Sequence, residues 1–229
     1  MYDYNKDAKI IMIFREPSSF LYSAYKHYFS SFKEIEKDFE KALSLEQSRK
    51  KGYNLYKRIN YPSNLFYSEK LKYATQLKRY LQYFPPKNIK VILYENFKNN
   101  NRKTLNEIFD FLKIKKVKIN ISQIINVTKN KEIKYDIIRW LKRVYTDPYN
   151  NTFVYRILCK IIPKNLRIKL IHLLIQLSKP KKTDKLSDKL KKKIKKDCYD
   201  EIKEFNRLLK EHNLSDEDVM KKWNITLDN

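Results

Sequence analysis

The sequence predicts an α/β fold in which a parallel β-sheet is flanked by helices and followed by a helical carboxyl-terminal part. Two short apolar runs, residues 8–14 and 89–94, are rich in β-branched residues, as buried strands are. Helical patterns separate them, and strands that alternate with helices form parallel sheets with right-handed crossovers. After residue 130 only helical patterns occur. The 229 residues suit a single domain, 1–229, with an α/β core over 1–128 and a helical part over 129–229.

The first unit along the chain is a strand, a tight turn and a helix. The run Ala-Lys-Ile-Ile-Met-Ile-Phe at residues 8–14 has the length and composition of a strand buried on both faces. The turn Arg-Glu-Pro-Ser-Ser follows, in which Pro17 keeps Glu16 extended and presets the first turn of a helix. Aromatic and aliphatic residues then recur at helical spacing over 20–32.

The middle of the chain predicts further helices around the second strand. Residues 33–64 are charged and poorly periodic, which predicts a short helix over 39–47 and then a loop. A helix over 66–84 ends at Pro85-Pro86, before the strand at 89–94. Residues 105–112 form the next helix, with their apolar residues on one stripe.

The carboxyl-terminal part consists of amphipathic segments separated by prolines. The predicted helices cover 133–144, 153–162, 166–177 and 186–209. Residues 153–178 are basic as well as amphipathic, so a helix pair on a membrane surface is an alternative to packing on the sheet. The wide apolar stripe and the break at Pro163 favour packing.

The charge of the chain is strongly positive, with 51 Lys+Arg against 26 Asp+Glu and a formal net charge of +25. Basic domains of this kind often bind nucleic acid. However, the lysines run from Lys6 to Lys222, and the abundance of Lys, Ile, Asn, Tyr and Phe is what an AT-rich genome encodes. The compositional explanation is therefore favoured, and a nucleic-acid partner is not expected.

Residue counts exclude several kinds of site. The chain has one glycine, Gly52, whereas the Rossmann fingerprint and the Walker phosphate loop each need at least two. Its 2 cysteines and 3 histidines lack the spacing of metal ligands, so no metal is expected. No apolar run reaches the roughly 20 residues that span a bilayer. A reducing cytoplasm is the expected location.

Polar residues follow both predicted strands, where ligands bind in parallel sheets. Arg15 follows the first strand and Tyr94-Glu95 ends the second. An arginine offers a permanently charged planar fork to a phosphate or sulfate, and Ser23 on the next helix could donate to the same oxyanion. The helix start would add partial positive charge and free backbone N–H groups. A solvated arginine beside a surface serine explains these residues equally well.

Residues 9–30 resemble the 3′-phosphate-binding segment of sulfotransferases that use 3′-phosphoadenylyl sulfate (PAPS), in which Arg-x-Pro follows a strand and a serine follows on the helix. Residues 73–81, 91–97 and 104–112 resemble the next segments in that family's order, and the ending near Trp223 resembles its bacterial, heparan-sulfate-type members.

The resemblance implies a P-loop-NTPase-like sulfotransferase fold, with PAPS as co-substrate. Arg15 and Ser23 would hold the 3′-phosphate, and Tyr94 would lie near the adenine. Three lysines could add charge near the nucleotide phosphates, or could be ordinary solvated residues: Lys129, Lys131 and Lys134. The implied reaction is in-line transfer of a sulfuryl group to a hydroxyl or amine of a glycan or small molecule.

The sequence departs from that family before the first strand. Sulfotransferases begin with a strand and a Lys-x-Gly-Thr-Thr-like loop that grips the 5′-phosphosulfate, and the base lies between that loop and the Arg-x-Pro segment. Only Met1–Asp7 precede the strand here, so we expect an amino-terminally truncated chain that transfers little or no sulfuryl group by itself and whose catalytic residues are unassigned. His27 is a weak candidate for the base. Two alternatives stay open: a non-catalytic nucleotide-binding module and a basic nucleic-acid-binding protein.

Overall fold

The computed structural model describes residues 2–117 and 186–226, except 32, 56–58 and 60, together with isolated positions between 160 and 173. The chain divides into two compact units. The first comprises Met1–Tyr25, Glu36–Asn126 and Leu186–Asn229, and the second comprises Lys26–Ile35 and Val127–Lys185. The two strands and the residues that directly follow them belong to the first unit. A single domain over 1–229 stays a prediction.

Several expectations fall outside the described residues. They are the helix over 133–144, almost all of the helices over 153–162 and 166–177, and the lysines at 129, 131 and 134.

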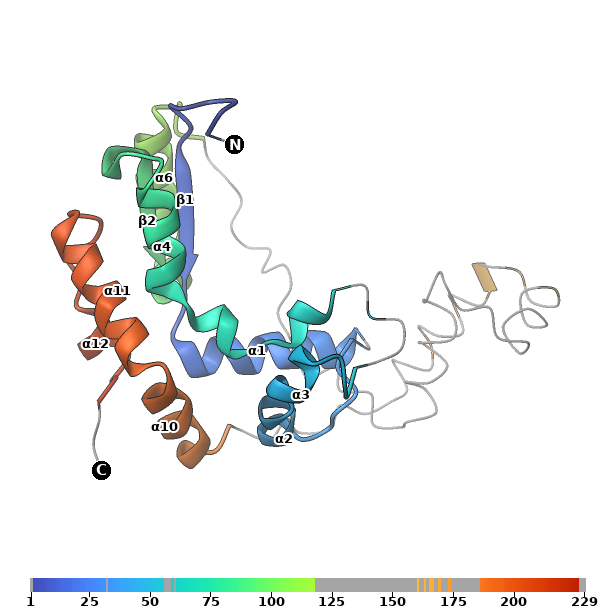
Figure 1. Cartoon of the computed structure of the whole chain (residues 1–229). Helices are drawn as coiled ribbons and strands as arrows, with labels where there is room; N and C mark the ends of the chain where they lie inside the picture. The colour runs from blue at the N-terminus through green and yellow to red at the C-terminus, as the bar shows by residue number, and fades with distance from the viewer. Residues whose placement is uncertain are drawn as a thin grey trace. The chain divides into compact units, whose positions relative to one another are not determined.

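Two parallel strands form the sheet that the sequence predicts. Strand β1 (Ile10–Phe14) pairs with β2 (Ile89–Leu93) in a continuous register from Ile10 opposite Ile89 to Phe14 opposite Leu93. The helices around this pair confirm the predicted class, a parallel sheet flanked by helices (Figure 1). Because the register is even, both strands end at the same level.

The two strands differ in how they are buried. In β2, Val91, Ile92 and Leu93 are all buried, as expected of a strand covered on both faces. In β1 burial alternates, and Ile11 and Ile13 are 37% and 60% exposed. The prediction that β1 is buried on both faces is therefore wrong. Successive side chains of a strand point to opposite faces, and only one face of β1 packs into the core.

The described helices include those predicted before residue 117, with different bounds, and one that was not predicted, α5, which begins at Tyr94 inside the predicted strand. They are α1 (Pro17–Ser30), α2 (Phe39–Ser44), α3 (Glu46–Lys50), α4 (Tyr73–Leu81), α5 (Tyr94–Asn99) and α6 (Asn101–Leu112), with short 3-10 turns η1 (Pro62–Leu65), η2 (Ser68–Leu71) and η3 (Pro86–Asn88). The predicted helix over 66–84 is interrupted at Lys72, whose ψ of 60° is not helical. The helix predicted from residue 105 begins earlier, because the Asn100 side chain caps it by accepting from the Lys103 N–H.

The carboxyl-terminal helices pack with the α/β core. They are α10 (Asp188–Asp197), α11 (Tyr199–Glu211) and α12 (Val219–Lys222). The prediction of a single helix over 186–209 is wrong, because the backbone leaves the helical region at Cys198 (φ −109°, ψ 10°), between α10 and α11. Helix α11 lies against α4 (Figure 1), and the Glu201 carboxylate accepts from the Thr75 N–H at 2.7 Å. A segment far along the chain thus completes the core.

Left-handed residues end several helices, although the chain has one glycine. Gly52 (φ 87°) ends α3, with the Tyr53 N–H donating to the Ser48 carbonyl at 2.9 Å. The same kind of ending uses Lys113, Asn213 and Asn224, with φ of 57°, 50° and 50°. A side chain at such a backbone position costs about 1 kcal/mol, and asparagine tolerates it better than lysine.

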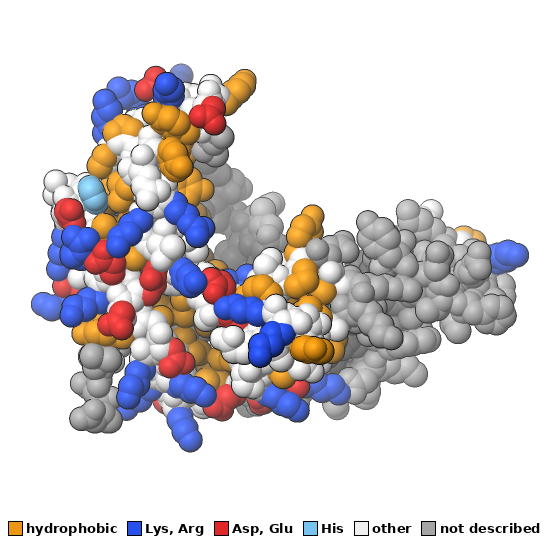
Figure 2. All heavy atoms as spheres, in the orientation of Figure 1, with side chains coloured by type: hydrophobic (Ala, Val, Ile, Leu, Met, Phe, Trp, Pro, Cys, Tyr) orange, Lys and Arg blue, Asp and Glu red, His pale blue; other side chains and the backbone are white. Residues whose placement is uncertain are grey.

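Charged side chains of both signs mix over the carboxyl-terminal helices (Figure 2). Lys78 and Arg207 both pair with Glu204, at 2.6 and 2.7 Å, and Lys210 pairs with Asp218 at 2.9 Å. Part of the positive charge is therefore locally compensated. Among the helices described, none has the length and apolar character needed to cross a bilayer.

Candidate functional site

Arg15 and Tyr94 lie side by side at the carboxyl ends of the two strands. The register pairs Phe14 with Leu93, and each site residue comes directly after one of them. The guanidinium carbon of Arg15 lies 4.6 Å from the centroid of the Tyr94 ring, which is a cation–π contact. The prediction that these strand ends meet is confirmed, because parallel strands with an even register end at one edge.

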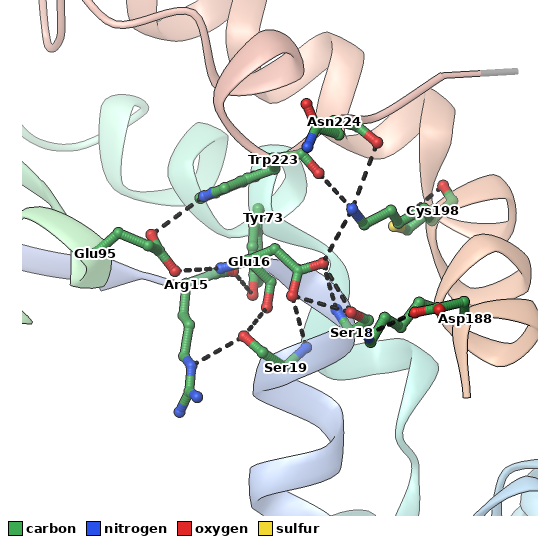
Figure 3. Close-up of polar contacts among 12 residues, drawn as sticks. Arg15, Glu16, Ser18, Ser19, Tyr73, Glu95, Asp188, Cys198, Trp223 and Asn224 are labelled. Carbon is green, nitrogen blue, oxygen red and sulfur yellow. Dashed lines mark hydrogen bonds and ion pairs between the residues drawn. The ribbon is translucent and has the colours of Figure 1, made fainter. Parts of the chain in front are cut away.

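Among the described residues, the Arg15 guanidinium makes a hydrogen bond through Nε alone, beside its contact with the Tyr94 ring. Its Nε–H donates to Ser19 Oγ at 3.1 Å, and the Ser19 hydroxyl donates to the Glu16 carbonyl at 3.0 Å. Neither terminal nitrogen of Arg15 has a hydrogen-bond partner within the described parts of the chain, and both point away from the surrounding polar network (Figure 3). An oriented fork with unpaired N–H groups suits a phosphate or sulfate oxygen. Sequence reasoning missed Ser19, although its spacing of four residues from Arg15 was visible.

Ser23 lies on α1 one turn beyond Ser19, on the same helix face. It is half-buried, and its hydroxyl has no hydrogen-bond partner among the residues that the structure describes. Ser23 therefore has an available donor on the side of α1 where Ser19 meets Arg15.

The amino terminus of α1 is already occupied by a carboxylate. Glu16 precedes the helix, and its carboxylate accepts from the backbone N–H of Ser18 at 3.2 Å and of Ser19 at 2.8 Å. The Ser18 hydroxyl donates to the same carboxylate at 2.8 Å. The expectation of free N–H groups at this helix start is wrong, because an acidic cap satisfies them. An anion at this edge would be held by side chains.

The peptide bond between Arg15 and Glu16 is held from behind the site (Figure 3). The Tyr73 hydroxyl donates to the Arg15 carbonyl at 2.8 Å, and the Glu16 N–H donates to Glu95 Oε1 at 3.0 Å. The other oxygen of Glu95 accepts from the Trp223 indole N–H at 3.1 Å. Burial raises the pKa of Tyr73 far above its usual range, so its hydroxyl remains a donor.

Two residues of the α10–α11 region complete the cluster. Lys195 Nζ donates to the Trp223 carbonyl at 2.5 Å and lies 3.7 Å from a carboxylate oxygen of Glu16. Cys198 is buried, and burial raises its pKa to about 12. It therefore stays a neutral thiol, which is a poor nucleophile.

The described residues include no cluster that suits a metal ion and one candidate base, His27. In the ranges described, no group of three His, Cys, Asp or Glu side chains could hold a metal ion. His27 lies exposed in the last turn of α1, within the part of that helix that belongs to the second unit. Its proposed role as a base stays untested.

Comparisons with known proteins point to one family. Residues 3–144 match the family model described as a sulfotransferase domain. A solved sulfotransferase from Alicyclobacillus acidocaldarius is 26% identical with a TM-score of 0.47, and the match covers 75% of this chain and 57% of that one. This chain therefore spans less than two thirds of the length of that protein. No curated protein matches.

Proposed function

The chain belongs to the sulfotransferase family, and we propose that it binds PAPS and transfers its sulfuryl group to a hydroxyl or amine of a glycan or small molecule. The observation that carries this proposal is the Arg15 side chain, which is fixed through Nε and has both terminal nitrogens unpaired among the described residues. Ser23, on the same side of α1, is the second proposed phosphate contact.

The chemistry of this pair fits the 3′-phosphate of the nucleotide. The two terminal nitrogens of a guanidinium can each donate to one phosphate oxygen, and a serine hydroxyl can donate to a third. The Tyr94 ring already contacts the guanidinium of Arg15, which limits where that fork can turn. Tyr94 is proposed to border the adenine as well, as the resemblance implies, and it lies beside the phosphate contact at the same edge of the sheet.

In the proposed reaction the acceptor oxygen or nitrogen attacks sulfur in line with the bridging oxygen. The new bond to sulfur forms as the sulfur–oxygen bond to the 5′-phosphate breaks, and adenosine 3′,5′-bisphosphate leaves. The acceptor proton passes to a base, to which we assign no described residue. Arg15 and Ser23 act on the far end of the donor, so they bind and orient it and do not touch the reacting atoms.

Calorimetry with adenosine 3′,5′-bisphosphate tests the proposal. Arg15→Ala is expected to weaken binding by about 1.5–3 kcal/mol, the range for a hydrogen bond to a charged group. Arg79→Ala is the matched control, since Arg79 is exposed on α4, and it should leave affinity unchanged. Equal affinities of wild type and Arg15→Ala would overturn the assignment.

Two further measurements separate the alternative functions. Release of the bisphosphate from PAPS in the presence of hydroxyl or amine acceptors indicates an active sulfotransferase, whereas tight binding without turnover indicates a non-catalytic nucleotide-binding module. Binding of DNA or RNA that falls steeply with salt, without any preference for the nucleotide, indicates the nucleic-acid-binding alternative.

A further inference from the structure

We propose that Glu95 is a positioning residue for the phosphate site: it holds the peptide from which Arg15 projects, and Trp223 holds it in turn. This inference rests on the proposed function for its link to the nucleotide. Its structural core, a carboxylate that sets the direction of Arg15, can be tested separately.

The first step concerns the peptide between Arg15 and Glu16. Its C=O and N–H lie just beyond Phe14, the last residue paired in the sheet, and the Glu16 N–H precedes the helical hydrogen bonds of α1. Regular secondary structure therefore satisfies neither group. The Tyr73 hydroxyl from α4 donates to the C=O, and the Glu95 carboxylate from α5 accepts from the N–H. Two side chains from separate helices thus fix the orientation of this one peptide plane.

The second step concerns what fixes those two side chains. Trp223 is 2% exposed and donates its indole N–H to Glu95 Oε2. Its ring lies parallel to Phe205, with centroids 6.4 Å apart and planes 5° apart, and edge-on to Tyr73, with centroids 6.1 Å apart. Tyr73 and Glu95 therefore share one rigid aromatic anchor from the carboxyl-terminal segment.

A second tie holds the same segment to the end of β2. Lys222 Nζ donates to Asn96 Oδ1 at 2.5 Å, and the Asn96 amide donates to the Glu217 carboxylate. Asn96 is the neighbour of Glu95 on α5, so Trp223 and the side chain of Glu95 are held in place by adjacent contacts.

The third step links the peptide to the ligand. Among the described residues, Arg15 makes one side-chain hydrogen bond, to Ser19, and Ser19 is held by the Glu16 carbonyl. Rotation of the Arg15–Glu16 peptide would therefore move both the Arg15 side chain and its support. Binding groups have to be held to within about 0.5 Å of the productive geometry, and supporting residues supply that precision.

The type of residue at position 95 matters for this role. Both oxygens of Glu95 accept, one from a backbone N–H and one from an indole N–H, and an ionised carboxylate only accepts. Glutamine would turn an NH₂ group toward one of these donors and lose that bond. Glu95→Gln is therefore a near-isosteric test, and Trp223→Phe removes the indole donor while it keeps an aromatic ring.

The experiment measures the affinity of the full chain for adenosine 3′,5′-bisphosphate and for adenosine 5′-monophosphate, which lacks the 3′-phosphate. Glu95→Gln and Trp223→Phe are expected to weaken bisphosphate binding by about tenfold, the scale of one charge-assisted hydrogen bond, and monophosphate binding by less than about twofold. In an Arg15→Ala background, Glu95→Gln should cause no further loss, because both changes remove the same contact. Glu107→Gln on α6, whose ion pair to Lys90 at 3.5 Å is partly exposed, is the matched control.

Three results would overturn the inference: unchanged bisphosphate affinity in Glu95→Gln, an equal loss for both nucleotides, or a loss that adds fully to that of Arg15→Ala. If wild type binds neither nucleotide, the proposed function fails. The Arg15 Nε–H resonance in NMR spectra of the unliganded chain then tests whether Glu95 sets the direction of Arg15. Glu95→Gln should then shift or broaden that resonance and Glu107→Gln should not. An unchanged resonance would show that Glu95 does not position Arg15.

Discussion

The ends of β1 and β2 lie side by side, yet several of the polar groups that follow them differ in whether they have hydrogen-bond partners. After β1, the terminal nitrogens of Arg15 and the hydroxyl of Ser23 have no hydrogen-bond partners in the described ranges. After β2, both oxygens of Glu95 and the amide of Asn96 are bonded to other parts of the protein. Parallel pairing places polar residues at one edge, but only groups left unpaired can receive a ligand. We propose that Arg15 and Ser23 after β1, with Tyr94 beside them, form the binding side, and that Glu95 and Asn96 after β2 support it.

The largest expected effect is a difference in stability between a variant of a supporting residue and a variant of a proposed binding residue. Trp223→Ala should lower the free energy of unfolding by about 3–5 kcal/mol, because it empties a buried aromatic site against Phe205 and Tyr73. Tyr94→Ala should cost less than about 1 kcal/mol, since Tyr94 is only half-buried. Urea unfolding monitored by circular dichroism measures both. Similar losses in the two variants would mean that the supporting and the proposed binding residues do not differ in this way.

A smaller effect is expected at the binding side. Ser23→Ala should weaken bisphosphate binding by about 1 kcal/mol, the net value of one hydrogen bond, and change stability by less than about 0.5 kcal/mol. Ser44→Ala is the control, because the Ser44 hydroxyl donates to the carbonyl of Lys41 on α2. Calorimetry and thermal unfolding of both variants are sufficient. A loss of stability without a loss of affinity would place Ser23 with the supporting residues.

Substitutions at two helix ends far from the site in sequence serve as a reference, because they should change stability without changing nucleotide affinity. Gly52→Ala should lower the free energy of unfolding by about 1 kcal/mol, because alanine is strained at this left-handed backbone position. A steric clash adds nothing to this cost, since no atom lies within 4 Å of the added Cβ. Lys113→Gly should stabilise by roughly 0.5–1 kcal/mol, since it relieves a lysine at φ 57°. Unfolding curves measure both. Any change in nucleotide affinity would show that stability and binding are coupled more widely than we infer.

The smallest effect concerns pH at the supporting end. Although burial raises the pKa of Glu217, hydrogen bonds from Lys222 and Asn96 outweigh it and hold that pKa below the ordinary value. A lowered pKa contributes stability above the unfolded pKa and loses it as pH falls through the folded pKa, so stability should fall from about pH 5 to pH 3. Glu217→Gln should make this fall shallower, as thermal unfolding across that range would reveal. An identical pH profile in both proteins would remove Glu217 from the supporting contacts.

Local patterns in the sequence predicted much of the proposed binding side. The apolar runs predicted both strands and their parallel pairing, and Arg15 and Tyr94 followed from their places after those runs. The cap at Glu16 was missed, because a glutamate before Pro-Ser-Ser was read only as an extended residue. The break at Cys198 was also missed, since the apolar stripe continues through it.

The supporting side could not be predicted in the same way. Tyr73, Glu95 and Trp223 are distant in sequence and meet only after α4, α5 and the carboxyl-terminal segment have packed. No spacing rule connects residues that belong to different elements.

By itself the sequence determined the class of fold, the two strands and the residues that follow them, because these depend on periodicity and turn chemistry over a few neighbouring residues. Tertiary structure alone decided which of those polar groups stay available. The carboxylates of Glu16 and Glu95 accept hydrogen bonds from other groups of the protein, whereas the terminal nitrogens of Arg15 have no such partner among the described residues. A polar group is available only if no donor or acceptor elsewhere in the chain reaches it, and that depends on how distant segments pack.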